Sequence, residues 1–209
     1  MSKFESIIET RDQLRAILKE PTEPVIRKTL KCLDKHCGVF IGRSPFMLLA
    51  TADANGNADV SPKGDPPGFV KIIDKHTLAI PDRPGNRRAD SMENILQHPN
   101  VGLIFLIPGK TETLRVSGTA SIVRDKGLRE SMSVNDQSPE LVIVVDVTEA
   151  FFHCSKCMVR SKLWKPEHWP DLKGLPRMAE TMVNAGKLEL SEGEMHKIVL
   201  NDERERLYE

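Results

Sequence analysis

The sequence predicts a mainly β protein, an antiparallel barrel with helices at both ends of the chain. About seven apolar or alternating runs lie between residues 46 and 152, and nearly all are joined by short turns. Short connections are typical of antiparallel neighbours. A single longer helical pattern follows the fourth run, which favours a barrel over a doubly wound sheet. The residues before and after this region carry helical periodicity instead.

Two helices are predicted near the N-terminus. The stretches "DQLRAIL" and "PVIRKTLKCLDKHC" place apolar residues three and four positions apart. Pro21 and Pro24 separate these stretches, and Thr22 is positioned to cap the second helix.

The first four strands are predicted as two hairpins. "FMLLATADANGNADVSPK" carries Asn55-Gly56 at a hairpin turn. "GFVKIID" and "TLAIPD" predict two further strands that are joined at Lys75-His76. A helix over about residues 87–97 follows and ends at His98-Pro99.

The next strands are "NVGLIFLIPG" and "TLRVSGTASIVRD", with Gly109 in the turn between them. "KGLRESMSV" predicts a short helix, and "ELVIVVDVTEAFFHC" predicts a central strand. The C-terminal region predicts one helix that ends at Gly186 and another that is capped near Ser191. We therefore expect one structural domain, with N-terminal helices packed on the barrel (1–40), the barrel (41–165) and a C-terminal helical extension (166–209).

Composition narrows the function classes. The 209 residues include 30 basic and 30 acidic side chains, so the chain lacks the basic excess that is typical of nucleic-acid binding. The sequence contains no run of 18 apolar residues, and its first residues are charged. We therefore expect no membrane span and no signal peptide, and a cytoplasmic location.

Four cysteines are expected to be reduced in that compartment: Cys32, Cys37, Cys154 and Cys157. "CSKC" has metal-ligand spacing, but the two cysteine pairs would have to converge across more than 110 residues. We therefore expect no metal site, and zinc bound by the four thiols is the weaker alternative. The neighbouring Phe151, Phe152 and Met158 favour partly buried, inert thiols for the second pair.

The stretch "AIPDRPGNRRADSMENIL" concentrates positive charge where a strand passes into a helix. Arg83, Arg87 and Arg88 bring fork-shaped donors to a helix start that already carries partial positive charge. Gly85 would let the backbone approach a ligand, and Asn86 is placed to cap the helix. These features favour a phosphate site.

The alternative is a solvated helix start whose arginines pair with Asp82, Asp90 and Glu93. Lys63 in "ADVSPKGDPPGFV" lies at a strand end, where it either reaches the same anion or is an exposed turn lysine. Arg115 in "TLRVSGTA" is a charge within an alternating strand, for which facing water is the default.

A further candidate is "HCSKCMVRSKLW", in which polar side chains recur at helical spacing beside Trp164. Such a rim suits a planar aromatic ligand, or it is an amphipathic connection whose Leu163 and Trp164 fill the core. His153 has no evident partner as a general base. The sequence shows no Ser-His-Asp order, paired-carboxylate motif, Walker loop or GxGxxG fingerprint, so no catalytic residue is identified.

Together the motifs resemble a known family. "FMLLATADANGNADVSPKGD", "AIPDRPGNRRADSMENILQHPNVGLIF" and "LRVSGTASIV" follow the order of the FMN-binding split-barrel flavoproteins related to pyridoxamine 5'-phosphate oxidase. "HCSKCMVRSKLW" is similar to the C-terminal signature of their bacterial FMN-binding subgroup. The resemblance spans roughly residues 40–165.

The resemblance implies a six-stranded split barrel that forms a homodimer with two FMN sites at its interface. It implies phosphate contacts from Lys63, Asn86, Arg87 and Arg88, with Arg83 as a further candidate. Backbone would face the flavin ring around Val60, Ser61 and Pro62, and around Ile80, Pro81 and Asp82. The other subunit would close the site with Lys156, Arg160, Ser161, Leu163 and Trp164, and Arg115 is included among the candidate cofactor contacts.

The implied function is an FMN-dependent oxidoreductase of unassigned substrate. The chain departs from the oxidase itself at Ala58 and at Ile80-Pro81, and it lacks the oxidase's substrate-binding Arg-x-His segment. The resemblance therefore points to FMN binding rather than to oxidation of a vitamin B6 phosphate. The alternatives are a deazaflavin, heme with His153 as an axial ligand, or a non-catalytic flavin-binding sensor or carrier.

Overall fold

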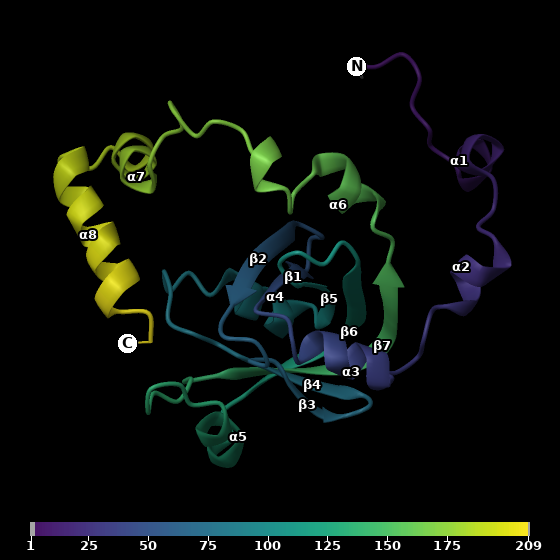
Figure 1. Ribbon diagram of the computed structural model, residues 1–209, viewed down its shortest axis with the longest axis horizontal. Coiled ribbons are helices and arrows are strands. Elements are labelled where there is room, and N and C mark those ends of the chain that lie inside the picture. Colours follow the sequence, from purple (N-terminus) through teal and green to yellow (C-terminus); the bar gives the residue numbers. More distant parts are fainter. Residues whose placement is uncertain (1–2, 209) are drawn as a thin grey trace.

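The fold is the antiparallel split barrel, mainly β with helices, that the sequence predicts. The computed structural model describes residues 3–208, and Figure 1 shows the barrel at the centre with the two ends of the chain on opposite sides. Within the described residues seven strands form one antiparallel sheet in the order β2-β1-β5-β6-β7-β4-β3. The strands are β1 (Phe46–Ala52), β2 (Ala58–Gly64), β3 (Lys71–Asp74), β4 (Thr77–Pro81), β5 (Asn100–Leu106), β6 (Thr113–Val123) and β7 (Val142–His153).

The strand count agrees with the residue pattern and exceeds by one the six strands implied by the family resemblance. The four-residue β3 lies at the sheet edge and pairs only with β4. The three predicted turns form, and the glycines of two of them, Gly56 and Gly109, each have a φ of 84°. Glycine adopts this left-handed conformation without steric cost.

The long strands β6 and β7 hold the two halves of the barrel together. The first half of β6 pairs with β5, and the first half of β7 pairs with β4. The register between β6 and β7 shifts at Gly118, where an added Cβ would overlap the carbonyl oxygen of Asp146. This position therefore requires glycine.

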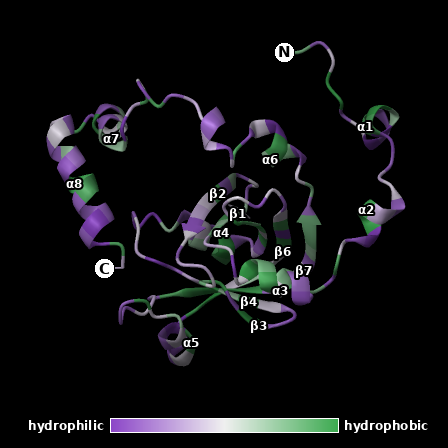
Figure 2. Cartoon of the chain, viewed as in Figure 1, coloured by the Kyte–Doolittle hydropathy of each residue, from purple (hydrophilic) through white to green (hydrophobic). Residues whose placement is uncertain are grey.

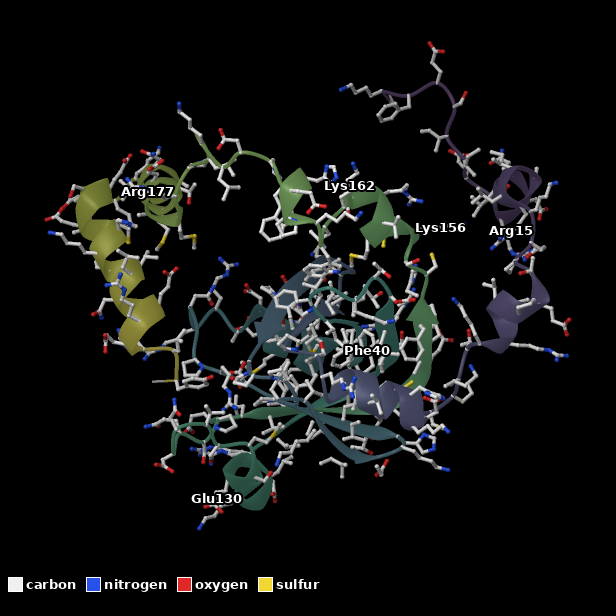
Figure 3. The ribbon with its side chains drawn as sticks, in the orientation of Figure 1. Arg15, Phe40, Glu130, Lys156, Lys162 and Arg177 are labelled. Carbon is white, nitrogen blue, oxygen red and sulfur yellow. The ribbon has the colours of Figure 1, made fainter. Side chains whose placement is uncertain are left out.

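The core follows from the alternation along the strands. Inward-facing residues of β1, β5 and β6 are fully buried, including Met47, Leu103 and Leu114. The helix α3 (Lys35–Ile41) packs against them and carries Phe40, which Figure 3 labels. The Phe40 ring meets the Phe152 ring edge-on at 5.5 Å between centroids.

The helix predicted over "PVIRKTLKCLDKHC" is wrong as a single element. It is broken into α2 (Glu23–Arg27) and α3. Between them Leu30 forms an antiparallel bridge with Ala150 of β7, beyond the part of β7 that pairs with β4. Asp34 then starts α3 by accepting a hydrogen bond from the Cys37 N–H, which also holds the pKa of the Asp34 carboxyl below its usual value. The side chain of Thr22 makes no capping hydrogen bond.

The remaining α-helices are α1 (Arg11–Leu18), α4 (Asp90–Gln97), α5 (Lys126–Ser131), α6 (Lys156–Ser161), α7 (Met178–Gly186) and α8 (Glu192–Glu205), and a short 3-10 helix covers Pro166–His168. The helix α7 ends at Gly186 and α8 is capped by Ser191, as predicted from the sequence. Ser191 and Glu194 form a capping box at this start.

Both ends of the chain expose apolar side chains. The helices α1 and α2 contain no buried residue, although Ile17, Leu18 and Ile26 are apolar and more than half exposed. Figure 2 shows such hydrophobic positions in α1, α2 and α6, outside the barrel. Trp169 and Leu172 are likewise exposed in the segment before α7. Among residues 3–208, no helix is both long and apolar enough to cross a membrane.

Candidate functional site

The predicted phosphate-binding residues meet in one cavity, formed by residues 59–63 of β2 and by residues 82–92, which comprise the β4–α4 connection and the start of α4. This loop cavity has a volume of about 350 Å³. It brings together Val60, Ser61, Pro62 and Lys63 with Asp82, Arg83, Asn86, Arg87 and Arg88. The two segments predicted from the sequence therefore lie side by side in the fold, although Lys63 and Asp82 are 19 residues apart in the chain.

The β2 wall of the loop cavity is an edge strand. It pairs only with β1, and its burial alternates, so that Ser61 and Lys63 are partly buried while Val60 and Pro62 are exposed. Val60 is 58 % exposed, although it is apolar. Proline lacks an N–H donor and is accordingly confined to such edge positions.

The opposite wall is a tight turn with two residues in the left-handed conformation, Arg87 at φ 59° and Ala89 at φ 58°. The helix α4 therefore begins at Asp90, three residues later than predicted. Asn86 is not its cap, because Ala89 occupies the N-cap position and α4 starts without a side-chain cap. The Asn86 Oδ1 instead accepts a hydrogen bond from the Arg88 N–H at 3.0 Å and so stabilises the turn.

Two of the cations in the loop cavity pair with neighbouring carboxylates, and of these pairs one is partly buried and the other is exposed. Lys63 Nζ lies 3.4 Å from Asp82 Oδ1, and Arg88 Nε lies 2.7 Å from Asp90 Oδ2. The hydrogen bond to Asp90 raises the pKa of Arg88. The Arg87 side chain forms no ion pair or hydrogen bond with any residue between 3 and 208. An incoming anion therefore meets the uncommitted guanidinium of Arg87 and two paired cations, and the exposed Arg88–Asp90 pair is individually weak.

Arg83 is held differently from the other two arginines. Its Nε donates to Asp65 Oδ2 at 2.6 Å, and its Nη2 donates to the Met132 carbonyl at 2.8 Å. The Asp65 side chain is 1 % exposed and that of Arg83 is 14 % exposed, so this ion pair is buried. The Tyr208 hydroxyl donates to the second Asp65 oxygen at 2.6 Å, and its ring lies 5.5 Å from the Arg83 guanidinium carbon. This network anchors the base of the turn.

Ile80 and Pro81 are buried in β4. Pro81 also lines a smaller neighbouring cavity of about 330 Å³, together with Ser61, Lys63 and Asn86. Neither Ile80 nor Pro81 lines the loop cavity itself.

The other candidate residues lie elsewhere in the same chain. Arg115 of β6 and Lys156 of α6 line a separate cavity under the N-terminal segment. Arg160, Ser161 and Leu163 are exposed on or just after α6. Trp164 is partly buried and donates from Nε1 to the Lys110 carbonyl at 2.8 Å. Within one chain, the "HCSKCMVRSKLW" segment does not line the loop cavity.

The thiols do not all follow the sequence prediction. Cys154 and Cys157 are exposed, contrary to the expectation of partial burial, because α6 starts beyond the end of β7 and outside the sheet. Cys37 is buried in α3, and this burial raises the pKa of its thiol to about 11. In the part of the chain that the structure describes, no three His, Cys, Asp or Glu side chains are arranged to hold a metal ion.

Sequence reasoning missed four residues around the loop cavity. The Ser91 hydroxyl donates to Asp59 Oδ2 at 3.1 Å and links α4 to β2. The alternation along β2 could have placed Asp59 on the same face as Lys63. Asp65 and Tyr208 carry no comparable signal, because they are 143 residues apart.

Comparison with known proteins places the chain in a family. The model described as pyridoxamine 5'-phosphate oxidase matches residues 33–154, more than half of the chain. The chain belongs to the pyridoxamine 5'-phosphate oxidase family. The match begins at Leu33, just before the N-cap residue of α3, and ends at Cys154, just after β7. It therefore includes all residues that line the loop cavity. α6 and the C-terminal helices lie outside it.

Several solved structures are similar to this family member. HupZ from Group A Streptococcus is 18 % identical, with a TM-score of 0.47 over 57 % of this chain and 93 % of that chain. An FMN-binding protein from Syntrophomonas wolfei subsp. wolfei is 11 % identical, with a TM-score of 0.41 over 54 % and 79 % of the two chains. HutZ, the heme storage protein from Vibrio cholerae, is 17 % identical, with a TM-score of 0.41 over 57 % and 93 %. No curated protein matches the chain.

Proposed function

We propose that this protein is a homodimeric, cytoplasmic FMN-binding flavoprotein that acts as an oxidoreductase on an unassigned substrate. The observation that carries the proposal is the loop cavity, which gathers Lys63, Arg87 and Arg88 in a chain of the pyridoxamine 5'-phosphate oxidase family. Three cations around a tight turn at a helix start suit a phosphate group.

The residues present fit a phosphate ester. A dianionic phosphate can take the free Arg87 fork and displace Asp90 from Arg88, because exposed ion pairs are individually weak. It can also compete with Asp82 for Lys63, whose Nζ lies 3.4 Å from the carboxylate oxygen, longer than a well-formed charge-assisted hydrogen bond. Gly85 has no atom within 4 Å of an added Cβ, so the turn leaves open space beside the backbone. The donor set therefore matches the charge and the size of the group.

In this proposal Arg87, Arg88 and Lys63 bind the phosphate, and the Asn86 side chain holds the turn that presents them. The backbone of residues 60–62 and 80–82 orients the ring, and Arg83 supports the turn through Asp65 rather than binding the phosphate. When bound, FMN supplies the hydride or electron transfer.

Two features of the single chain support the proposed dimer: an exposed apolar residue beside the loop cavity, and candidate site residues that do not line that cavity. Val60 on the edge strand β2 is apolar and exposed beside the loop cavity. Lys156, Arg160 and Ser161 do not line the loop cavity of their own chain, and we propose that they reach the cofactor of the partner. Leu163, Trp164 and Arg115 belong to the same proposed contribution.

The absorbance spectrum of the purified protein tests the proposal. A flavin spectrum that appears on purification or after addition of FMN supports it, with protein and flavin present in equal amounts. A deazaflavin band at shorter wavelength or a Soret band would assign the barrel to another cofactor. A colourless protein that takes up no FMN would refute the proposal.

Turnover separates an enzyme from a flavin-binding sensor or carrier. Sustained oxidation of NADH or NADPH by the FMN-loaded protein, with oxygen or a dye as acceptor, supports the oxidoreductase. Stable FMN binding without turnover by either donor would favour the sensor or carrier.

A further inference from the structure

Two thiols with two residues between them lie where β7 passes into α6, on either side of the Lys156 that Figure 3 labels. Cys154 follows the last residue of β7, and Cys157 lies in the first turn of α6. Both are exposed, whereas Cys32 is partly buried and Cys37 is buried. Neither exposed thiol belongs to the residues proposed to contact FMN. The two thiols that are open to a reagent in solution are therefore also neighbours in the chain.

The backbone between these two thiols brings them within reach of a disulfide bond. Ser155 has helical dihedral angles, φ −71° and ψ −9°, and Lys156 begins α6. The Ser155 carbonyl accepts a hydrogen bond from the Val159 N–H at 2.9 Å, which holds this turn. Two helical residues in succession bring the flanking Cα atoms to within about 7 Å, and disulfides join Cα atoms that are about 4.4–6.8 Å apart. Cys154 and Cys157 can therefore be joined without a change in the sheet.

The surroundings of Cys154 favour an anionic reaction partner. Cys154 lines the cavity under the N-terminal segment together with Lys28 and Lys31, and Glu149 is the acidic side chain that lines it. Neither lysine forms an ion pair with any residue between 3 and 208. The Lys28 Nζ donates to the carbonyl of Phe152, two residues before Cys154, at 2.9 Å. Unpaired positive charge raises the local concentration of anions, so Cys154 is the thiol that an anionic disulfide meets first.

We propose that Cys154 and Cys157 form a thiol–disulfide exchange site for small anionic disulfides of the glutathione class. The Cys154 thiolate attacks one sulfur of the small disulfide, forms a mixed disulfide and expels one thiolate. The Cys157 thiolate then attacks the Sγ of Cys154 and expels the second thiolate. One small disulfide and two protein thiols thus give one protein disulfide and two small thiols, and the two protons lost by the protein pass through solvent to the released thiolates. Neither step uses a flavin or oxygen, so the proposal does not depend on FMN binding.

Thiol mapping on the full chain tests the proposal. The reduced protein is incubated with glutathione disulfide, its remaining thiols are alkylated with iodoacetamide in denaturant, and it is digested with trypsin without a reductant. Cleavage after Lys156 places Cys154 in peptide 130–156 and Cys157 in peptide 157–160, so a disulfide between them links the two peptides. We expect this linked pair as the main product. Free thiols at both positions, or stable glutathione adducts without a link, would overturn the proposal.

Single variants assign the order of attack. Cys157→Ser keeps the thiol that lines the cavity and should stop at a glutathione adduct on Cys154, because no second thiol resolves it. Cys154→Ser should form its adduct on Cys157 at least about tenfold more slowly, because Cys157 does not line the cavity. Cys32→Ser is the matched control and should give the linked pair as the parent does. Equal adduct rates for Cys157→Ser and Cys154→Ser, or a faster reaction of Cys154→Ser, would refute Cys154 as the attacking thiol.

The charge of the small disulfide tests the role of the cavity. Glutathione disulfide is an anion at neutral pH, whereas cystamine is a cationic disulfide. The rate with glutathione disulfide divided by the rate with cystamine should be at least about threefold lower in Lys28→Gln/Lys31→Gln than in the parent, and added salt should lower it in the parent. Lys173→Gln/Lys197→Gln removes the same charge from exposed positions outside the cavity and should keep the parent's ratio. Equal ratios in the two double variants would contradict the preference for an anionic disulfide.

Discussion

Removing the Asp65 carboxylate should destabilise the protein more than any other single change near the loop cavity. Asp65 is 1 % exposed and accepts from Arg83 and Tyr208, both at 2.6 Å. Removing one partner of a buried ion pair costs about 3–5 kcal/mol. Arg83 is 14 % exposed and keeps its bond to the Met132 carbonyl, so we expect the lower end for Asp65→Ala, about 3 kcal/mol. For a chain of this length that corresponds to a fall in Tm of about 6–12 °C.

Urea denaturation followed by circular dichroism measures this effect, and a double-mutant cycle assigns it to the pair. Arg83→Met alone leaves Asp65 without its cation, but in the double variant Asp65→Ala/Arg83→Met no buried charge remains unpaired. We therefore expect the double variant to lose at least about 1 kcal/mol less than the sum of the single losses. Tyr208→Phe keeps the ion pair and should cost about 1 kcal/mol. A loss below about 1 kcal/mol for Asp65→Ala, or additive single losses, would refute the reasoning.

Three further predictions follow from the same structure. The Asp65 carboxylate raises the pKa of the Tyr208 phenol above its usual value of 10.0, so stability should fall as the pH rises above 10; pH-dependent melting should show a smaller fall in Tyr208→Phe. Gly118→Ala places a Cβ against the backbone and should lower the free energy of unfolding by at least about 3 kcal/mol. In the control Gly102→Ala the added Cβ meets only an ordinary contact at 3.8 Å, and the free energy of unfolding should change by less than about 1 kcal/mol. Comparable urea midpoints for the two variants would contradict the bulge geometry at Gly118. Cys37 should resist alkylation in the native protein and react after denaturation, since its thiol is buried with a pKa of about 11; rapid native labelling would disprove this.

The strands were predictable because their signals are local. Alternation along β1 and β6, and the turn residues Asn55-Gly56 and Gly109, depend on neighbours in the sequence. The helix over "PVIRKTLKCLDKHC" failed because Leu30 pairs with a strand 120 residues away, and no local periodicity encodes such a bridge. Tertiary pairing there overrides helix propensity.

In the candidate site, too, residues with a local sequence signal could be predicted, and residues that only the fold brings together could not. Arg87 and Arg88 were found from their spacing in one turn, and Lys63 from its place at a strand end. The alternative in which the arginines pair locally is correct for Arg88 and Asp90. The buried partner of Arg83 could not be predicted, because Asp65 reaches it only through the fold. The left-handed backbone at Arg87 also lacked a sequence signal, since glycine is the residue that usually marks this conformation.

FMN titration of the variant Arg87→Ala/Arg88→Ala tests the central proposal most directly. Flavin fluorescence quenching measures the dissociation constant, and Arg124→Ala/Arg129→Ala is a matched control that removes two arginines paired with Glu140 outside the loop cavity. The proposal predicts FMN binding to the parent and to the control, and at least about a hundredfold weaker binding to Arg87→Ala/Arg88→Ala. Riboflavin, which lacks the phosphate, should bind the parent and this variant equally. Unchanged FMN affinity in Arg87→Ala/Arg88→Ala would contradict the assignment of the loop cavity as the phosphate site.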